Sequence, residues 1–273
     1  MRVSCLIDNA VSASAPCWGE HGLSFLIESA GRTVLLDTGA SSEVLLHNLA
    51  VARVAPAELD AVALSHGHRD HTGGLAALLA AKPALTVLAH PRVTAPRFSR
   101  REGALREIGM PAGTVALLER ATLCLSREPG SLAPGVWTTG EIVTRAEPEG
   151  RSSTHCVRDG DRLAPDPYID DLSLVLETQN GLVLLCGCCH AGLLNTLAHV
   201  KARFGAWPRR VIGGTHLGSA SAGELAHVVE RLAALDLAAL YPNHCTGQAA
   251  YVAMASALGR RVAPFPAGTV LDL

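Results

Sequence analysis

Short apolar runs separated by polar turns recur along the first third of the chain, and they predict strands that alternate with helices. Residues 22–30 and 31–39 read as two strands joined by a glycine-containing turn, which favours an antiparallel hairpin. A helix opened by a serine cap is expected at 41–49. The next expected elements are a buried strand at 57–66, a helix at 73–83 that Pro83 stops, and a strand at 84–91. This order is typical of a sheet with helices on its face.

A similar pattern resumes at about residue 170. Asn180 and Gly181 signal a tight turn in the middle of an apolar hairpin at 171–187. Ser221 and Glu224 have the spacing of a capping box. The elements expected after the hairpin are helices at 191–205, 221–235 and 248–259 and strands at 209–218 and 237–247. Because the halves share one order and no long linker separates them, we expect a single α+β domain over residues 1–273, a four-layer αββα sandwich with two sheets.

The middle of the chain, at about residues 91–165, is polar and rich in arginine. Its weak periodicity is typical of an inserted flap, with short strand signals at 114–120, 121–130 and 135–143. Arginine forks suit phosphate or carboxylate, so this segment is a candidate for binding a phosphorylated substrate. The simpler interpretation, which we favour, is a solvated flap surface. The arginines concerned are Arg97, Arg100, Arg101 and Arg106.

Composition narrows the class of protein. Hydrophobic residues make up 48% of the chain and charged residues 18%, which favours a packed core over disorder. With 23 Lys and Arg against 25 Asp and Glu, the net charge is −2, which argues against nucleic acid or an anionic membrane as a partner. The first residues lack the apolar region of a signal peptide, and no run is long enough to span a membrane. We therefore expect a soluble, cytoplasmic protein whose cysteines are thiols rather than a disulfide scaffold.

Four of the expected strands end in a histidine. Because the carboxyl ends of neighbouring strands share one edge of a sheet, these histidines are expected to meet there. They are His66, His190, His216 and His244. Three other histidines, His47, His199 and His227, fall in helical stretches and are expected to be ordinary hydrogen-bonded side chains.

The stretch HGHRDH at 66–71 crowds metal-binding side chains together. In an extended segment alternate residues share a face, so His66 and His68 can chelate one cation. Asp70 and His71 follow after the chain turns, and they can face a second cation. Burying these side chains without a metal would leave costly unpaired polar groups. Imidazole and carboxylate ligands predict two divalent ions, with zinc first and iron or manganese as alternatives.

The motifs SHGHRDHTGGL at 65–75 and VLLDTG at 34–39, with the late strand-end His244, resemble the metallo-β-lactamase-fold superfamily. EHGLSFLIE at 20–28, TGEI at 139–142, GCCHAGLLNT at 187–196 and NHCTG at 243–247 are similar to the subgroup of 7,8-dihydropterin-6-methyl-4-(β-D-ribofuranosyl)aminobenzene-5′-phosphate synthase. The resemblance covers most of the chain. It implies the metallo-β-lactamase fold, with His66 and His68 on one metal, Asp70 and His71 on the other, and His190 and His244 completing the two sites. Asp37 would orient the ligand loop.

The chain departs from the family pattern at one position. Many members have a bridging aspartate where this sequence has GCCH. The bridge here is open between Cys188, an aspartate of the pair Asp170 and Asp171, and water alone. Cys188 is equally well explained as a structural thiol, and an aspartate pair before a strand is more often a cap or turn.

This metal set predicts a hydrolase of an ester, phosphoester or lactone of a small molecule, acting by metal-bound hydroxide. Asp70 would hold a metal and orient the hydroxide. His216 would donate a proton or contact substrate, unless it is only a hydrogen-bonded edge residue, and His21 would lie at the rim on resemblance alone.

Two other functions stay open. One is a transferase that joins a pterin methyl carbon to a phosphoribosyl aminobenzene, with the metals handling a diphosphate leaving group. The other is a redox protein with an iron–sulfur centre on the CGCC stretch, whose cysteines are too close together for the usual ligand spacing. The oligomeric state is also open, a homo-oligomer included.

Overall fold

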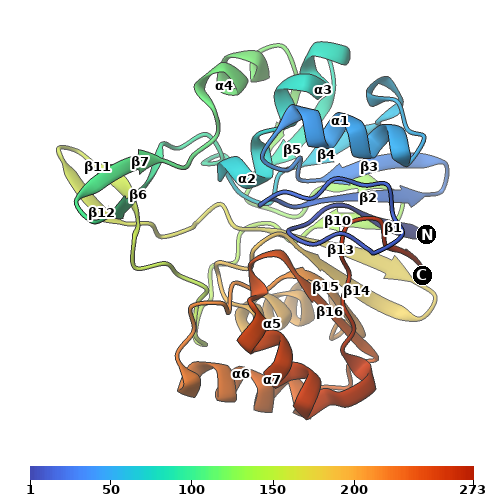
Figure 1. The fold of residues 1–273 in the computed structure, drawn as a ribbon, viewed down its shortest axis with the longest axis vertical. Coiled ribbons are helices and arrows are strands. Elements are labelled where there is room, and N and C mark those ends of the chain that lie inside the picture. The colour runs from blue at the N-terminus through green and yellow to red at the C-terminus, as the bar shows by residue number, and fades with distance from the viewer.

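The computed structural model describes residues 1–273 and has two large sheets packed face to face (Figure 1). The first sheet is antiparallel from β17 to β3 and parallel from β3 to β8. In spatial order its strands are β17 (Val270–Asp272), β1 (Arg2–Ile7), β2 (Ser24–Ser29), β3 (Arg32–Leu36), β4 (Ala61–Ala63), β5 (Thr86–Ala89) and β8 (Thr122–Leu125). The expected hairpin of β2 and β3 is confirmed, with Phe25 opposite Leu36.

The second sheet has three parallel strands whose carboxyl ends lie at the same edge. In spatial order its strands are β16 (Ala239–Asn243), β15 (Arg210–Gly214), β14 (Gly181–Cys186), β13 (Ser173–Thr178), β10 (Val136–Thr138) and β9 (Ser131–Ala133). The turn at Asn180 and Gly181 joins β13 to β14, as the sequence predicted.

Helices cover the outer face of each sheet (Figure 1). On the first sheet these are α1 (Ser42–Val51), α3 (Leu75–Ala81) and α4 (Ala112–Leu118), with the short α2 (Arg69–Thr72) at the sheet edge. On the second sheet they are α5 (Leu193–Phe204), α6 (Ala222–Ala234) and α7 (Gln248–Leu258). Ser41 caps α1, and Ser221 and Glu224 form the expected capping box of α6. None of these helices has the length and apolar character needed to cross a membrane.

Three apolar layers hold these parts together. One lies between the sheets, and each of the others lies between a sheet and its helices. Phe25 of β2 and Leu174 of β13 are both fully buried in the central layer. Strands with apolar residues on both faces are what a sheet covered on both sides requires. The expected four-layer αββα architecture is confirmed.

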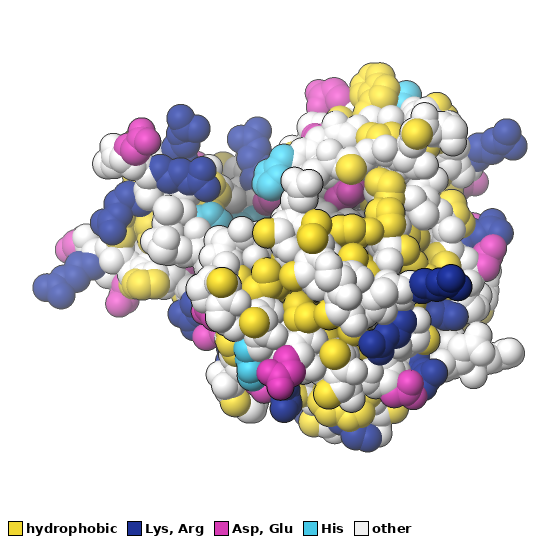
Figure 2. Space-filling view, turned by 60° about the horizontal axis from the view of Figure 1, so that its bottom comes forward, with side chains coloured by type: hydrophobic (Ala, Val, Ile, Leu, Met, Phe, Trp, Pro, Cys, Tyr) yellow, Lys and Arg dark blue, Asp and Glu magenta, His cyan; other side chains and the backbone are white.

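A third, smaller sheet projects from the body and forms the flap (Figure 1). Its strands in spatial order are β12 (Arg162–Pro165), β11 (His155–Asp159), β6 (Arg97–Arg101) and β7 (Ala104–Glu107). Figure 2 shows Lys and Arg side chains gathered on the projecting part of the molecule. Between β7 and β11 the chain returns to the main layers, where β8 joins the first sheet and β9 and β10 join the second.

The expected strand at 114–120 was wrong, because this segment lies in and just after the helix α4. Pro111 precedes the helix and has a fixed φ that suits a helix start. Leu118 then packs in the layer between the first sheet and its helices. The short apolar run was compatible with either element, and packing decided between them.

Arg97 fastens the base of the flap to the body and is only 2% exposed. Its Nε donates a hydrogen bond of 2.9 Å to Asp166, and its Nη2 donates to Asp170. The other carboxylate oxygen of Asp170 accepts the backbone N–H of Gly67 at 2.8 Å. The expectation of a solvated or anion-binding Arg97 was therefore wrong, whereas Arg100, Arg101 and Arg106 are exposed. The partners of Arg97 lie about seventy residues away in sequence, so no local pattern could reveal them.

Replacing Arg97 with alanine is expected to lower the free energy of unfolding by about 4 kcal/mol, because it leaves two buried carboxylates without their cation. Urea denaturation measures the loss. Arg100→Ala, at an exposed position of the same strand, should change the free energy of unfolding by less than about 0.5 kcal/mol. Equal effects of the two substitutions would contradict the structural role of Arg97.

Candidate metal centre

The strand-end histidines meet at the edge where the two large sheets come together. His66 follows β4, His190 follows β14, and His244 follows β16. The rings of His66 and His190 are 4.9 Å apart between centroids, although the two residues come from different sheets. Asp37, His216 and His244 have positive φ angles, which residues other than glycine rarely adopt. Backbone strain of this kind concentrates at functional sites.

The first donor group consists of His66, His68 and His190, which are all buried. One nitrogen from each ring lies within 4.8 Å of the others. His68 Nδ1 lies 3.0 Å from His66 Nε2, and the Nε2 atom of His190 is buried and has no hydrogen-bond partner. An unpaired buried polar atom is costly, and a cation bound among these three rings would satisfy His190 Nε2.

The second donor group consists of Asp70, His71 and His244, whose donor atoms also lie within 4.8 Å of one another. Asp70 Oδ2 is 3.7 Å from His71 Nε2 and 3.5 Å from His244 Nε2. The Asp70 side chain is 23% exposed, so solvent reaches this group. His21 is 72% exposed, and its Nε2 lies 3.4 Å from Asp70, which places it at the rim.

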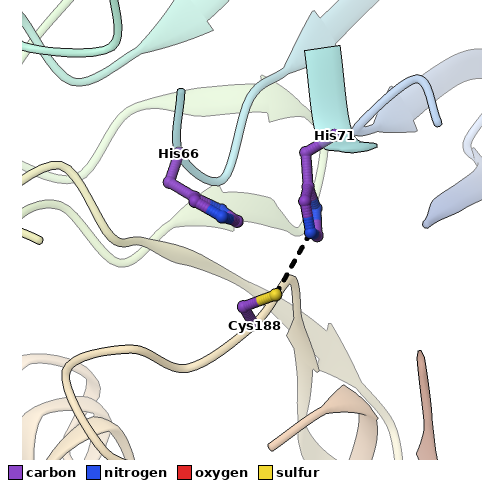
Figure 3. A group of neighbouring side chains, drawn as sticks. All are labelled: His66, His71 and Cys188. Atoms are coloured by element: carbon purple, nitrogen blue, oxygen red, sulfur yellow. Dashed lines mark hydrogen bonds between the residues drawn. The ribbon is translucent and has the colours of Figure 1, made fainter. Parts of the chain in front are cut away.

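Cys188 lies between the two donor groups. Figure 3 shows its side chain pointing toward His66 and His71 from the opposite sheet. The Cys188 Sγ atom is 3.1 Å from His71 Nε2, and it also lies within reach of His244 and Cys245. All eight cysteines of the chain are free thiols. Cys188 therefore lies near members of both donor groups, as a bridging side chain would.

The two aspartates that were bridging alternatives are engaged elsewhere. Both oxygens of Asp170 have partners at the base of the flap. Asp171 Oδ2 accepts the backbone N–H of Ala191 at 2.8 Å. Burial raises the pKa of Asp171 to about 7. Neither carboxylate is among the clustered donors.

Asp37 fixes the orientation of one histidine in each donor group, His66 through Ser65 and His71 directly. This fully buried carboxylate accepts the N–H of Ser65 at 2.7 Å and its hydroxyl at 2.6 Å. Its Oδ2 atom also accepts a 2.7 Å hydrogen bond from His71 Nδ1. The Ser65 hydroxyl lies 2.9 Å from His66 Nδ1. Asp37 thus holds one histidine of each group, which agrees with the orienting role that the resemblance implied.

The remaining ring nitrogens also favour metal binding. His190 Nδ1 donates to the carbonyl of Gly150 at 2.8 Å, and His244 Nδ1 lies 3.0 Å from Asn9 Oδ1. These contacts place the ring proton on Nδ1 and leave Nε2 as the lone-pair donor. The His190 ring also stacks on Tyr168, with centroids 4.0 Å apart. The residues present fit a pair of divalent metal ions.

Without metal, burial and neighbouring charges shift the pKa values of these groups in opposite directions. Burial lowers the pKa of His66, His68 and His190 well below their usual value. Burial alone would also lower the pKa of His71, but the charges of Asp37 and Asp70 raise it to about 9. Most of these rings are therefore neutral, as metal ligands must be.

The metal-free protein, prepared by chelation, is expected to be most stable near pH 6.5. Below this value the unfolded chain binds more protons than the native state, since the pKa of His66, His68 and His190 is lowered on folding. Each such histidine costs about 1.4 kcal/mol of stability per pH unit as the pH falls. His71 acts in the opposite sense, so its contribution is lost as the pH rises toward 9. Urea midpoints across this range test the expectation, and a flat profile below pH 6.5 would contradict it.

His216 lies beside the first donor group, with its ring 4.2 Å from that of His190 between centroids. Burial, together with the charge of His155, lowers the pKa of His216 to about 4. A ring that is neutral at pH 7 is better suited to contacting substrate or accepting a proton than to donating one. Its catalytic role stays a prediction.

Sequence reasoning missed several neighbours of the site. His155 of β11 lies 5.1 Å from His68 between ring centroids, and its Nδ1 is 3.0 Å from the Tyr168 hydroxyl. His155 lies within the polar flap, where no pattern distinguished it. Asn9 follows β1, a strand that was not predicted. Cys245 had a usable signal, because it stands next to His244 in the strand-end motif.

Comparison with known proteins places this geometry in context. The model of the metallo-beta-lactamase superfamily matches residues 18–244. A 7,8-dihydropterin-6-methyl-4-(beta-D-ribofuranosyl)-aminobenzene-5′-phosphate synthase of Methanocaldococcus jannaschii is 30% identical over 264 residues, which cover 90% of this chain and 88% of that protein. The uncharacterized protein MJ0448 of the same organism is 29% identical over 90% of each chain.

Two solved structures cover the whole chain. Tm1679, a metal-dependent hydrolase of the beta-lactamase superfamily, is 26% identical with a TM-score of 0.86, and the match covers 99% of that chain. Zn²⁺-bound PqqB from Methylobacterium extorquens is 16% identical with a TM-score of 0.61 over all of both chains, a likeness of fold.

Proposed function

The chain belongs to the metallo-beta-lactamase superfamily as a metal-dependent enzyme, and we propose that it is a hydrolase of an ester or phosphoester bond in a small molecule. The observation that carries the proposal is the pair of donor groups at one sheet edge, one of which is open to solvent at Asp70. The likeness to Tm1679, a metal-dependent hydrolase, supports the same reaction class.

We assign one divalent ion to His66, His68 and His190 and a second to Asp70, His71 and His244. When bound, such a pair supplies an acidified water and a Lewis acid that polarises a carbonyl or phosphoryl oxygen. Histidine with carboxylate suits zinc, iron or manganese, and the neighbouring thiol of Cys188 favours the softer zinc or iron.

The chain's own groups position the reaction. The carboxylate of Asp70 is partly exposed to solvent, and it is suited to orient the attacking water and to accept its proton. Asp37 holds His66 and His71 in place from beneath. His155 of the flap strand β11 and Tyr168 both pack beside His68, where they are suited to limit the access of bulk water.

Elemental mass spectrometry on protein purified without added metal, combined with a hydrolysis screen, tests this proposal. The screen contains a phosphodiester, a carboxylic ester and a lactone. We expect about two metal ions per chain and hydrolysis that chelation abolishes and metal restores. The double variant His66→Ala/His68→Ala should lose both metal and turnover. Full metal content with no hydrolysis of any of the three classes would overturn the hydrolase assignment.

A second candidate function is that of the synthase from Methanocaldococcus jannaschii, and the 30% identity over 90% of this chain favours it. Its test is formation of the product that the synthase's name describes, detected by mass spectrometry after incubation with a dihydropterin diphosphate and the ribofuranosylaminobenzene phosphate. Product formation without hydrolysis in the screen would make the chain a transferase. Absence of this product would exclude that function.

A further inference from the structure

The strand register sorts the side chains of the flap onto two faces. His155 of β11 is directly opposite Ser99 of β6, which in turn is opposite Arg106 of β7. Opposite residues share a face, and so do alternate residues along a strand, which adds Arg101 to this row. We call the face with Ser99, Arg101, Arg106 and His155 the inner face.

The outer face carries a different set of residues. Cys156 is opposite Phe98, and the alternation along their strands adds Arg158 and Arg100. The guanidinium of Arg158 lies over the Phe98 ring at 5.2 Å, as expected for side chains on one face.

The inner face is turned toward the metal centre. His155 packs against His68, a member of the first donor group. Beyond β7 the chain runs beside the loop that carries His66 and His68. Gly109 pairs with His68 there, and the Arg69 N–H donates a hydrogen bond of 2.8 Å to the carbonyl of Ile108.

The two inner-face arginines have no carboxylate partner. Arg101 and Arg106 are exposed, and neither takes part in an ion pair, in contrast to Arg97 at the base of the flap. Glu107 lies on the outer face, and the inner-face Asp159 is directly opposite Arg162. Figure 2 shows histidine side chains where the basic projection meets the body. The positive charges of Arg101 and Arg106, which no ion pair neutralises, therefore lie on the face of the flap that is turned toward the metal centre.

We propose that Arg101 and Arg106 bind a phosphate monoester group of the substrate and hold it at the mouth of the metal centre. The two arginines are diagonal neighbours on adjacent strands, so both planar forks can reach one phosphate. Arg106 is two strands from His155, a span of about 10 Å, so this phosphate lies away from the metals. It is a recognition group, and the bond that is cleaved lies elsewhere in the substrate. This inference rests on the proposed function and narrows its substrate class to phosphorylated small molecules.

Isothermal calorimetry on the metal-loaded full chain tests the phosphate site, with glycerol 3-phosphate as the probe. Arg101→Gln/Arg106→Gln is expected to weaken binding of the probe about tenfold or more, because each charge-assisted contact is lost. The matched control, Arg100→Gln/Arg158→Gln, removes the same charge from the outer face and should bind as the wild type does. Binding by the metals themselves is common to all these proteins and cancels in the comparison.

Several outcomes would overturn the phosphate site. The wild type could fail to bind glycerol 3-phosphate, or both double variants could weaken its binding equally. Glycerate, which lacks the phosphate, could also bind as tightly as glycerol 3-phosphate does. The hydrolysis screen separates the two proposals. Binding that depends on the two arginines, without hydrolysis of any substrate in the screen, would support the phosphate site and contradict the hydrolase assignment. Hydrolysis together with binding that does not depend on the arginines would support the hydrolase assignment and contradict the phosphate site.

Discussion

Replacing His68 with alanine is expected to reduce turnover about a thousandfold and the metal content from two ions to one per chain. The substitution removes one of three donors from the first donor group. Loss of a residue that only hydrogen-bonds to a metal ligand already lowers metal affinity or activity about 10–100-fold, and loss of the ligand itself should cost more. Elemental mass spectrometry and steady-state turnover measure the two effects. His227→Ala, at a partly exposed helical position, is the matched control and should change neither quantity.

The stability of the metal-free His68→Ala variant distinguishes a metal ligand from a structural histidine. His68 Nε2 is buried without a partner, so its removal relieves a cost that offsets the loss of packing and of the 3.0 Å contact between His68 Nδ1 and His66 Nε2. We expect the metal-free variant to unfold at a urea concentration close to that of the metal-free wild type. A large loss of stability in the metal-free state, with metal content unchanged, would instead assign His68 to the core.

Replacing Asp37 with asparagine is expected to weaken metal binding about 10–100-fold without changing the fold. Asparagine tolerates the positive φ of this residue, so the backbone is not strained further. Its amide would present N–H groups to His71 Nδ1, where the carboxylate now accepts a hydrogen bond. His71 would then move its proton to Nε2, the nitrogen that faces Asp70 and Cys188.

Metal titration followed by calorimetry measures the affinity of the Asp37→Asn variant, and ¹⁵N NMR of the histidine rings reports the tautomer of His71. Asp60→Asn, which removes a partly exposed carboxylate paired with Arg32 and far from the donor groups in the fold, is the control and should leave the affinity unchanged. Wild-type affinity in Asp37→Asn would show that the hydrogen bond to His71 does not set its tautomer.

The parts of the site that sequence could predict are those encoded by local pattern. The run at 66–71 and the histidines at strand ends identified the members of both donor groups, because periodicity and topology together place strand ends at one edge. Residues whose position depends on pairing with segments far away in the sequence gave no such signal. His155 arrives on a flap strand, and Arg97 is buried only because Asp166 and Asp170 come to it from elsewhere in the chain.

The solvated surface predicted for the flap is confirmed for Arg100, Arg101 and Arg106 but not for Arg97, which is buried. Four arginines within ten residues read as one solvated surface, and the register divides them between burial, the outer face and the inner face. A strand alternates its side chains with a period of two, but the pairing that decides which face meets the body depends on β11, more than fifty residues later.

Each donor group takes members from both halves of the chain. His66 and His71 come from the first sheet, whereas His190 and His244 come from the second. Neither cation can reach full coordination until the two halves have docked, so metal acquisition is expected to be a late step of folding. Once bound, each ion joins segments that are far apart in sequence, and it opposes their separation as a covalent cross-link between the halves would.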